Sequence, residues 1–371
     1  MFVLKSDLEK IVRPREGSRP LPVAFGCSWT ELTVAERRFF ADVNPFGFIL
    51  FRRNCESPDQ VRWLVRELRA TVNRADAPVF IDQEGGRVAR LQPPRWSKQP
   101  AARLFGQIYQ EDPDWALEAL QISTRIAAHE LADLGITANC APVVDLLFDD
   151  GTAALGDRCY GGKPEMVAAL ARVAAETMLK CGVLPVLKHF PGHGRMRLDP
   201  HKTLPTITAS RAELEGEDFV PFELLRDIPC GMTSHAVYEA LDSNKPASLS
   251  TTIHQEIIRG ALGFDGLLLS DDLAMKAIIG VLDNLALRAI EAGTDVVLHC
   301  SGNMDEMRLV ASRLPVMSDP SWARWLRAKE MVSAVDQGYD SADDIARLDT
   351  LLGGFAGAVA TGMGRDPTEA V

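Results

Sequence analysis

The stretch Gly182-Val183-Leu184-Pro185-Val186-Leu187-Lys188-His189-Phe190-Pro191-Gly192-His193-Gly194 indicates how this chain is built. Its first half is short, apolar and branched, which is typical of a buried strand. Glycine and proline then interrupt regular structure, so Lys188 and His189 come at the strand end and the rest is loop. The same loop continues to Asp199 and His201. This group of polar side chains at the end of a buried strand indicates a catalytic site.

Apolar runs of this kind recur along the chain with helical stretches between them. Residues 57–74 illustrate the helices: Ser57 is a suitable N-cap, Pro58 occupies the first turn, and apolar residues form one stripe. Eight strands are predicted, at residues 21–26, 46–51, 79–82, 136–142, 183–188, 230–235, 266–270 and 295–299.

Eight short strands alternating with helices predict an α/β protein built as a single (β/α)₈ barrel. We expect one catalytic domain over residues 1–371, with a core at about 21–317 and a short helical C-terminal tail at 318–371. A doubly wound sheet is the alternative, but it requires a glycine-rich turn after the first strand. The segment Gly26-Cys27-Ser28 does not supply one.

The composition excludes several classes of protein. A formal net charge of −11 disfavours nucleic acid and anionic membrane as partners, because both require a basic face. Seven cysteines without paired spacing are typical of reduced thiols in the cytoplasm. The charged first twenty residues resemble no secretory signal, and no apolar run reaches about 18 residues. We therefore expect a cytoplasmic protein, and a monomer.

Two further strand ends carry carboxylates. Asp82 follows the run Val79-Phe80-Ile81, and either faces a ligand or caps the next helix. Asp271 and Asp272 follow Leu267-Leu268-Leu269-Ser270; side chains alternate along a strand, so one of the two points into the barrel mouth and the other away. The residues alone do not decide which.

A metal site is an alternative interpretation of the central loop. His189, His193, Asp199 and His201 are all zinc ligands by type. The neighbouring Lys188 would place a second cation beside the ion, so no metal and no organic cofactor is predicted.

The remaining histidines and one aspartate are predicted to be structural. Asp145 is expected to accept hydrogen bonds from loop backbone N–H groups, and His235 to be a packing histidine. His129 and Glu130 are interpreted as a solvated pair on a helix. His254 and His299 have no evident partner in the sequence.

The segment Lys188-His-Phe-Pro-Gly-His-Gly, followed by an Asp-x-His, resembles the signature of the bacterial β-N-acetylhexosaminidases of glycoside hydrolase family 3. The resemblance covers roughly residues 21–298 and implies a barrel fold. It implies that Asp271 is the nucleophile and that Asp272 caps the following helix. It also implies a set of sugar-binding residues at matching positions, namely Asp82, Arg90, Arg158, Lys188 and His189.

The function implied is that of a retaining exo-β-N-acetylglucosaminidase acting on muropeptides during peptidoglycan recycling. A retaining hydrolase needs a second group that gives and takes a proton, and His201 suits this role, with Asp199 orienting its ring. Arg158 and Lys188 are expected to bind sugar rather than hold the fold. One departure from the family pattern is Pro200, where related sequences usually carry serine. A glycoside phosphorylase, a metal-dependent barrel hydrolase and an inactive sugar-binding protein are the alternatives.

Overall fold

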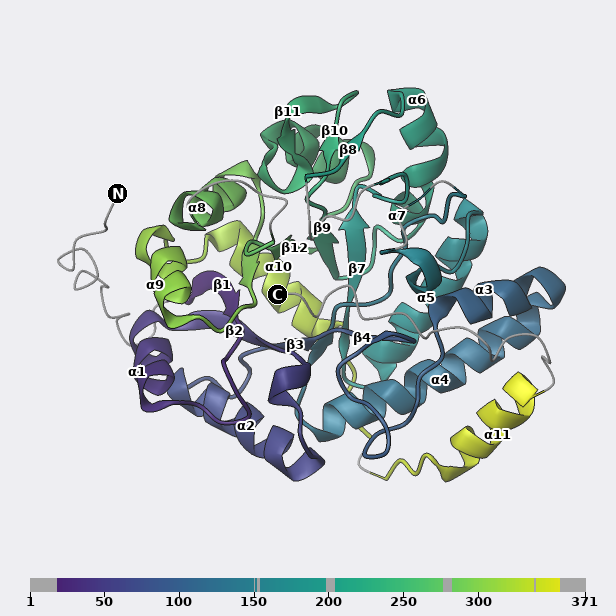
Figure 1. Ribbon diagram of the computed structural model, residues 1–371, viewed down its shortest axis with the longest axis horizontal. Coiled ribbons are helices and arrows are strands. Elements are labelled where there is room, and N and C mark those ends of the chain that lie inside the picture. Colours follow the sequence, from purple (N-terminus) through teal and green to yellow (C-terminus); the bar gives the residue numbers. More distant parts are fainter. Residues whose placement is uncertain are drawn as a thin grey trace.

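The computed structural model describes residues 19–149, 151, 154–197, 204–275, 282–336 and 338–353. Eight parallel strands close into a barrel in the order β1-β13-β12-β9-β7-β6-β3-β2, and helices surround it (Figure 1). The strands are β1 (Leu21–Phe25), β2 (Pro45–Leu50), β3 (Val79–Ile81), β6 (Ala138–Asn139), β7 (Leu184–Phe190), β9 (Cys230–Thr233), β12 (Leu267–Asp272) and β13 (Val296–His299). All eight predicted strands are present, and the predicted barrel is confirmed.

Helices connect successive strands and cover the outside of the barrel. They are α1 (Val34–Val43), α2 (Pro58–Thr71), α3 (Ala102–Glu111), α4 (Pro113–Asp133), α5 (Pro164–Lys180), α6 (Arg211–Glu213), α7 (Val220–Leu224), α8 (Leu282–Ala292) and α9 (Met304–Arg313), with a π-helical segment at Ile253–Ala261. Helix α2 begins as predicted, because the Ser57 side chain accepts from the backbone N–H of Gln60. No helix among the described residues is long and apolar enough to cross a lipid bilayer.

The βα loops, at the carboxyl-terminal end of the barrel strands, contain additional short strands. A hairpin of β4 (Gln83–Gly85) and β5 (Val88–Ala89) follows β3. A small sheet of β8 (Thr206–Ile207), β10 (Val237–Tyr238) and β11 (Asp242–Pro246) joins the loops after β7 and β9. The hairpin and the small sheet lie at the carboxyl ends of the barrel strands. This is the end at which β/α barrels place their active sites.

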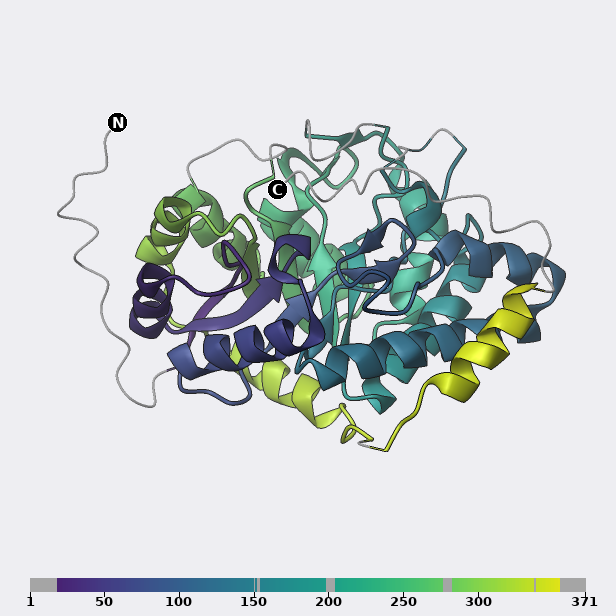
Figure 2. The ribbon, with the colours of Figure 1, turned by 60° about the horizontal axis from the view of Figure 1, so that its bottom comes forward.

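The predicted helical tail is present as α10 (Asp319–Glu330) and α11 (Ala342–Gly353). Helix α10 lies across the opposite end of the barrel from the loops (Figure 2). Its Trp325 packs edge-on against Phe46, at a ring separation of 5.0 Å, and belongs to the apolar cluster that fills the barrel interior. This end of the barrel is therefore closed by a packed helix, and the pocket described below lies at the other end.

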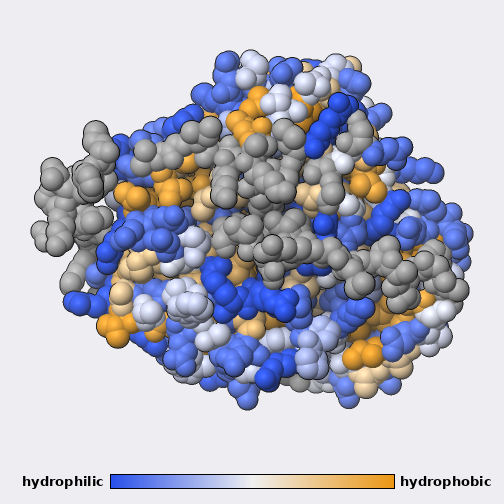
Figure 3. All heavy atoms as spheres, viewed as in Figure 1, coloured by the Kyte–Doolittle hydropathy of each residue, from blue (hydrophilic) through white to orange (hydrophobic). Residues whose placement is uncertain are grey.

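Helix α11 packs against α4. Arg125 of α4 forms two hydrogen bonds of 2.6 Å with Asp344, and Leu348 and Leu351 are buried against the main core. The visible face of the molecule is mostly hydrophilic, with smaller hydrophobic patches between the polar regions (Figure 3).

Candidate active site

A pocket lies at the carboxyl ends of the barrel strands. Its wall contains five of the residues predicted to be catalytic or sugar-binding, which come from β7, from β12, from the position after β3 and from the loop after β6. The lining residues are Ile49, Phe51, Asp82, Ala154, Leu155, Arg158, Lys188, His189, His193, Met196, Met232, Asp271, Asp272, Met275, Leu298 and Cys300. The tertiary fold thus brings Asp82, Arg158, Lys188, His189 and Asp271 together from distant parts of the chain.

One side of the pocket is built from an alternating row of charges. Arg90 contacts Asp82 at 2.9 Å, and Asp82 in turn contacts Lys188 Nζ at 2.9 Å. Lys188 lies 2.6 Å from Glu84, whose two carboxylate oxygens each accept from Arg158 at 2.8 Å. The row contains three cations and two carboxylates, and each carboxylate lies between two cations. A buried charge is stable only when paired in this way, so the row holds its members in place.

The pairing decides the protonation of the two carboxylates. Burial by itself raises the pKa of Asp82, but the charges of Lys188 and Arg90 outweigh burial and hold that pKa well below its usual value. Burial likewise acts to raise the pKa of Glu84, and Arg158 and Lys188 reverse the effect, giving about 2. Both carboxylates are therefore ionised at neutral pH and are hydrogen-bond acceptors only.

The cations respond in the matching direction. Burial acts to lower the pKa of Lys188, but the neighbouring Asp82 and Glu84 carboxylates raise it overall. Arg158 behaves in the same way, with Glu84 as its main partner. Lys188 is 2% exposed and Arg158 7%. Because both side chains are buried in ion pairs, we expect them to stabilise the fold as well as to bind sugar, since removing either would leave a buried carboxylate with one cation in place of two.

Glu84 is a site residue that the sequence analysis did not select. Its side chain is 5% exposed and joins Lys188 to Arg158. The available signal was its spacing, two residues after Asp82 and immediately before Gly85 and Gly86. Gly85 has φ 96°, and a Cβ there would lie 2.2 Å from the Pro100 carbonyl oxygen, so the β4–β5 hairpin depends on glycine to bring Glu84 inward.

Arg90 lies behind Asp82 and does not line the pocket. Its side chain is buried, with the guanidinium 4.9 Å from the centre of the Phe51 ring. The structure therefore places Arg90 where it supports Asp82, whereas the sequence predicted a direct contact with sugar.

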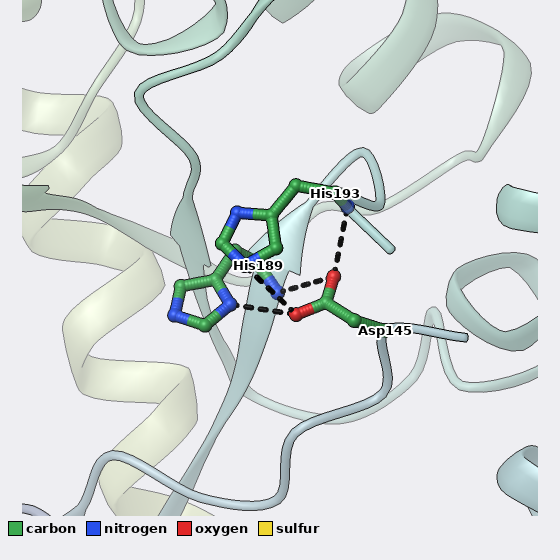
Figure 4. Close-up of side chains that lie close together, drawn as sticks. All are labelled: Asp145, His189 and His193. Carbon is green, nitrogen blue, oxygen red and sulfur yellow. Dashed lines mark hydrogen bonds and ion pairs between the residues drawn. The ribbon is translucent and has the colours of Figure 1, made fainter. Parts of the chain in front are cut away.

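Asp145, His189 and His193 form a second buried group (Figure 4). One oxygen of Asp145 accepts from the backbone N–H groups of His189 at 3.3 Å and His193 at 2.9 Å, as predicted for this residue. The other oxygen lies 2.7 Å from His189 Nδ1. The two imidazoles stack at 4.0 Å between centroids. Asp145 therefore orients both the loop and the His189 ring.

His189 is neutral in this setting. Burial lowers its pKa to about 3, against the opposing charge of Asp271. Since Asp145 accepts two backbone hydrogen bonds, we assign the proton of the neutral ring to Nδ1, which leaves Nε2 as an acceptor. Burial also lowers the pKa of His193 well below its ordinary value. His193 Nε2 is 3.2 Å from Asp145 but lacks the alignment of a hydrogen bond.

The same three residues are the one group among the described residues whose geometry could hold a metal ion. Their donor atoms lie within 4.8 Å of one another, and all three residues are buried. Two of them, His189 and His193, belong to the set of possible zinc ligands in the sequence. The other two members of that set, Asp199 and His201, lie outside the described residues, as does Pro200.

The opposite side of the pocket is the end of β12. Asp271 is half-buried, and its Oδ1 accepts from the backbone N–H of Asp272 at 2.8 Å. Asp272 is 5% exposed, and its Oδ1 accepts from Ala274 N at 3.1 Å and Cys300 N at 3.0 Å. Asp272 therefore organises the turn immediately after the strand, where residues 273–275 are not helical.

The other histidines have structural partners. His235 bonds Ser248 Oγ at 2.7 Å and the Asp272 carbonyl oxygen at 3.0 Å, which confirms a packing role. His254 bonds the Ser250 carbonyl at 2.9 Å and Thr294 at 3.1 Å. His299 lies 3.1 Å from Ser301 Oγ and 3.5 Å from Glu306.

The interpretation of His129 and Glu130 as a solvated pair is wrong. His129 stacks on Tyr339 at 3.8 Å between ring centroids, and Glu130 accepts from Ser97 N at 2.9 Å. The chain leading into α11 covers this face of α4, which the helical spacing of α4 alone could not reveal.

The mouth of the barrel thus combines paired charges, neutral histidines and a separate strand end with two carboxyl groups, at the position where β/α barrels place their active sites. Comparison with known proteins identifies the class. Residues 28–318 match the Glycosyl hydrolase family 3 N terminal domain. The chain belongs to this family and is a glycoside hydrolase acting on a carbohydrate substrate.

Relatives and solved structures agree with this assignment. The chain is 38% identical to a β-hexosaminidase of Alkalilimnicola ehrlichii over 284 residues, covering 76% of this chain and 80% of the relative. It is 34% identical to a β-hexosaminidase of Neisseria meningitidis over 345 residues, covering 90% and 93%. It is similar to native NagZ of Neisseria gonorrhoeae, with a TM-score of 0.81, 32% identity and coverage of 91% and 99%. That protein has also been solved with N-trifluoroacetyl-D-glucosamine and with a zinc ion.

Proposed function

We propose that this protein is a retaining exo-β-N-acetylglucosaminidase that removes terminal N-acetylglucosamine from muropeptides during peptidoglycan recycling. The observation that carries the proposal is the division of the pocket. A row of paired charges on one side supplies fixed donors and acceptors for sugar hydroxyls, and Asp271 faces the same pocket from β12. The similarity to β-hexosaminidases and to NagZ supports the N-acetylglucosamine specificity.

Asp271 is the proposed nucleophile. Its carboxylate attacks the anomeric carbon, the bond from that carbon to the leaving oxygen breaks, and a glycosyl ester on Asp271 forms. Water then attacks the same carbon and releases Asp271, so the product keeps the original configuration. The hydrogen bond from Asp272 N to Asp271 Oδ1 orients the carboxylate in the pocket wall.

His201 is the proposed acid and base, with Asp199 orienting its ring. It gives a proton to the leaving oxygen in the first step and takes one from water in the second. A histidine suits both steps, because its ordinary pKa of about 6.5 lies close to neutral pH.

Asp82, Arg158, Lys188 and His189 are proposed to bind the sugar ring directly. Asp82 and His189 Nε2 accept from hydroxyls, and Lys188 and Arg158 donate to them. Arg90 is proposed to act through Asp82, whose second oxygen it holds.

Covalent labelling tests the nucleophile. A 2,4-dinitrophenyl glycoside of N-acetylglucosamine carrying fluorine at C5 should leave a sugar on the peptide that contains Asp271, detected by peptide mass spectrometry. The Asp271→Asn variant should remain unlabelled. An adduct on Asp272, or steady turnover with no adduct, would remove Asp271 from this role.

Leaving-group dependence tests His201. His201→Ala should lower kcat/KM strongly for an alkyl glycoside, which requires protonation, and far less for a dinitrophenyl glycoside, which does not. Equal losses with both substrates would show that another group is the acid.

A metal-dependent hydrolase is the second candidate, favoured by the Asp145, His189 and His193 group and by the zinc complex of the similar Neisseria gonorrhoeae protein. Full activity after dialysis against a chelator, with no gain on adding zinc, would exclude it. A phosphorylase is tested in the same assay: phosphate should leave the rate unchanged, and no sugar 1-phosphate should form.

We also propose that the enzyme is a cytoplasmic monomer. The support is chemical, since all seven cysteines are free thiols, six of them buried. Light scattering of the purified chain at micromolar concentration should give the mass of one chain.

A further inference from the structure

The carboxyl group of Asp272 is buried in the pocket wall, and no residue that the structure describes places a counter-ion at hydrogen-bonding distance from it. Its Oδ1 accepts two backbone N–H groups, from Ala274 and Cys300. Its Oδ2 is inaccessible to solvent and has no hydrogen-bond partner in the described part of the chain. Within the described ranges, no cation contacts Asp272 in the way that Lys188 contacts Asp82.

An ionised carboxylate is unfavourable in this position. Two N–H donors satisfy one oxygen, but a buried charge whose other oxygen is unpaired carries the full cost of losing water. A neutral carboxyl group avoids that cost and keeps Oδ1 as the acceptor for both N–H groups. Asp271, the preceding residue, is the proposed nucleophile and must be ionised to attack, and a second charge beside it would repel the first.

We propose that Asp272 is a protonated positioning residue, so that the adjacent pair at the end of β12 carries a single negative charge, borne by Asp271. The inference rests on the proposed role of Asp271 as nucleophile. Asp272 acts through its backbone, because its N–H holds Asp271 Oδ1 at 2.8 Å while its side chain ties the turn to Ala274 and Cys300. Ionisation of Asp272 would pull Oδ2 toward solvent, disturb this turn and displace Asp271.

The surroundings of Asp272 agree with the neutral form. Burial raises its pKa to about 7; the two backbone N–H groups oppose this shift, and the charge of Asp271 adds to it. His235, two residues after the end of β9, lies 3.0 Å from the carbonyl oxygen of Asp272 through its Nε2. Arg53, after β2, has an electrostatic interaction with Asp272. The Arg53 guanidinium donates its hydrogen bonds to the carbonyl oxygens of Cys27 and Cys300. Cys300, after β13, remains a thiol because burial raises its pKa.

Thermal stability as a function of pH tests the protonation without relying on activity. An aspartate in the unfolded chain ionises near pH 4, and Asp272 in the folded protein near pH 7. Between these values the folded state binds more protons, so its stability falls as pH rises through the window. Asp272→Asn removes this penalty. The Tm of Asp272→Asn minus that of the wild type should therefore rise between pH 5 and pH 8.

Asp82→Asn is the matched control, because Asp82 is an equally buried aspartate of the same pocket held ionised by cations. Its Tm relative to the wild type should be lower throughout pH 5–8, with no rise across the window. A Tm difference for Asp272→Asn that stays constant, or falls, between pH 5 and pH 8 would overturn the proposal. Failure of Asp272→Asn to fold would overturn it too, since an amide keeps the Oδ1 acceptor and removes only the charge.

Kinetics distinguish positioning from a merely structural role. With a dinitrophenyl glycoside, which does not need the His201 proton, wild-type kcat/KM should fall above about pH 7. Asp272→Asn should keep kcat/KM within about tenfold of wild type at pH 6 and lose this alkaline fall. Persistence of the fall in the variant would assign it to another group and overturn the proposal, and so would inactivity at every pH.

The control Asp271→Asn separates this inference from the proposed function. If Asp271→Asn retains full activity, the nucleophile assignment fails. The pH dependence of the Tm difference for Asp272→Asn still decides whether Asp272 is protonated.

Discussion

Asp82 and Asp272 are buried carboxyl groups at the ends of two barrel strands, they line one pocket, and they have opposite protonation. Asp82 contacts Lys188 and Arg90 at 2.9 Å each, which holds its pKa well below the usual value. Asp272 has two backbone N–H donors on one oxygen and, among the residues that the structure describes, none on the other, and burial raises its pKa to about 7. The two side chains are similarly buried, so the difference in pKa comes from their partners, which are cations for Asp82 and backbone N–H groups for Asp272.

The difference divides the pocket into two parts with different tasks. The β3–β7 side has every carboxylate compensated by cations, which suits a rigid surface that binds hydroxyl groups. On the β12 side, the Asp272 carboxyl group has no cation at hydrogen-bonding distance among the described residues, and the neighbouring Asp271 is the group proposed to form and break a bond.

Asp271→Asn should reduce kcat/KM by roughly 10³-fold or more, since an amide cannot form the glycosyl ester. The Tm should change little, because Asp271 is half-buried and its Oδ1 acceptor survives as the amide oxygen. Steady-state kinetics and differential scanning fluorimetry measure the two effects. A large decrease in Tm with only a modest decrease in kcat/KM would show that Asp271 stabilises the fold and is not the nucleophile.

Lys188→Met should lower the free energy of unfolding by roughly 3–5 kcal/mol and also raise KM, because it leaves Asp82 and Glu84 buried without their shared cation. Urea unfolding at pH 7 measures the first effect. Lys180→Met, at the exposed end of α5, is the matched control and should be near neutral. Equal stability of the two variants would show that the charge row does not hold the fold.

Glu84→Gln should change how the free energy of unfolding depends on pH below about pH 4.5. The Glu84 pKa is lowered to about 2 from an ordinary 4.5, so its ionised form stabilises the protein above about pH 4.5, and this contribution is lost as pH falls toward 2. The variant should be less stable than the wild type at pH 7, by roughly 1–3 kcal/mol. The difference in free energy of unfolding between wild type and variant should decrease as pH falls from 4.5 to 2. A gap that stays constant on acidification would contradict an ionised Glu84.

Phe51→Leu should have the smallest effect. The Phe51 ring lies 4.9 Å from the Arg90 guanidinium, and such a contact is worth about 0.5–2 kcal/mol when shielded from water. KM should rise by less than about tenfold with kcat nearly unchanged, because Arg90 acts only through Asp82. A large fall in kcat would mean that Phe51 positions reacting atoms.

Much of the fold was predictable because its signals are local. The eight strands appear as short apolar runs, and Ser57 and Pro58 mark the start of α2. Parallel strands in a barrel end at one face, so the polar residues after each run were expected to meet, and Asp82, Lys188 and Asp271 do meet. The positions that matched family motifs supplied the remaining candidates.

The sequence by itself determined the barrel, the end at which the pocket lies and most of the residues in its wall, because hydrophobic periodicity and strand-end position are properties of consecutive residues. Only the tertiary structure decided that Glu84 joins Lys188 to Arg158, that Arg90 stands behind Asp82, and that Tyr339 covers His129. It also decided the protonation of Asp272, which depends on which donors approach each oxygen. The charge of a buried group is set by neighbours tens or hundreds of residues away, and only folding brings them within a few ångströms.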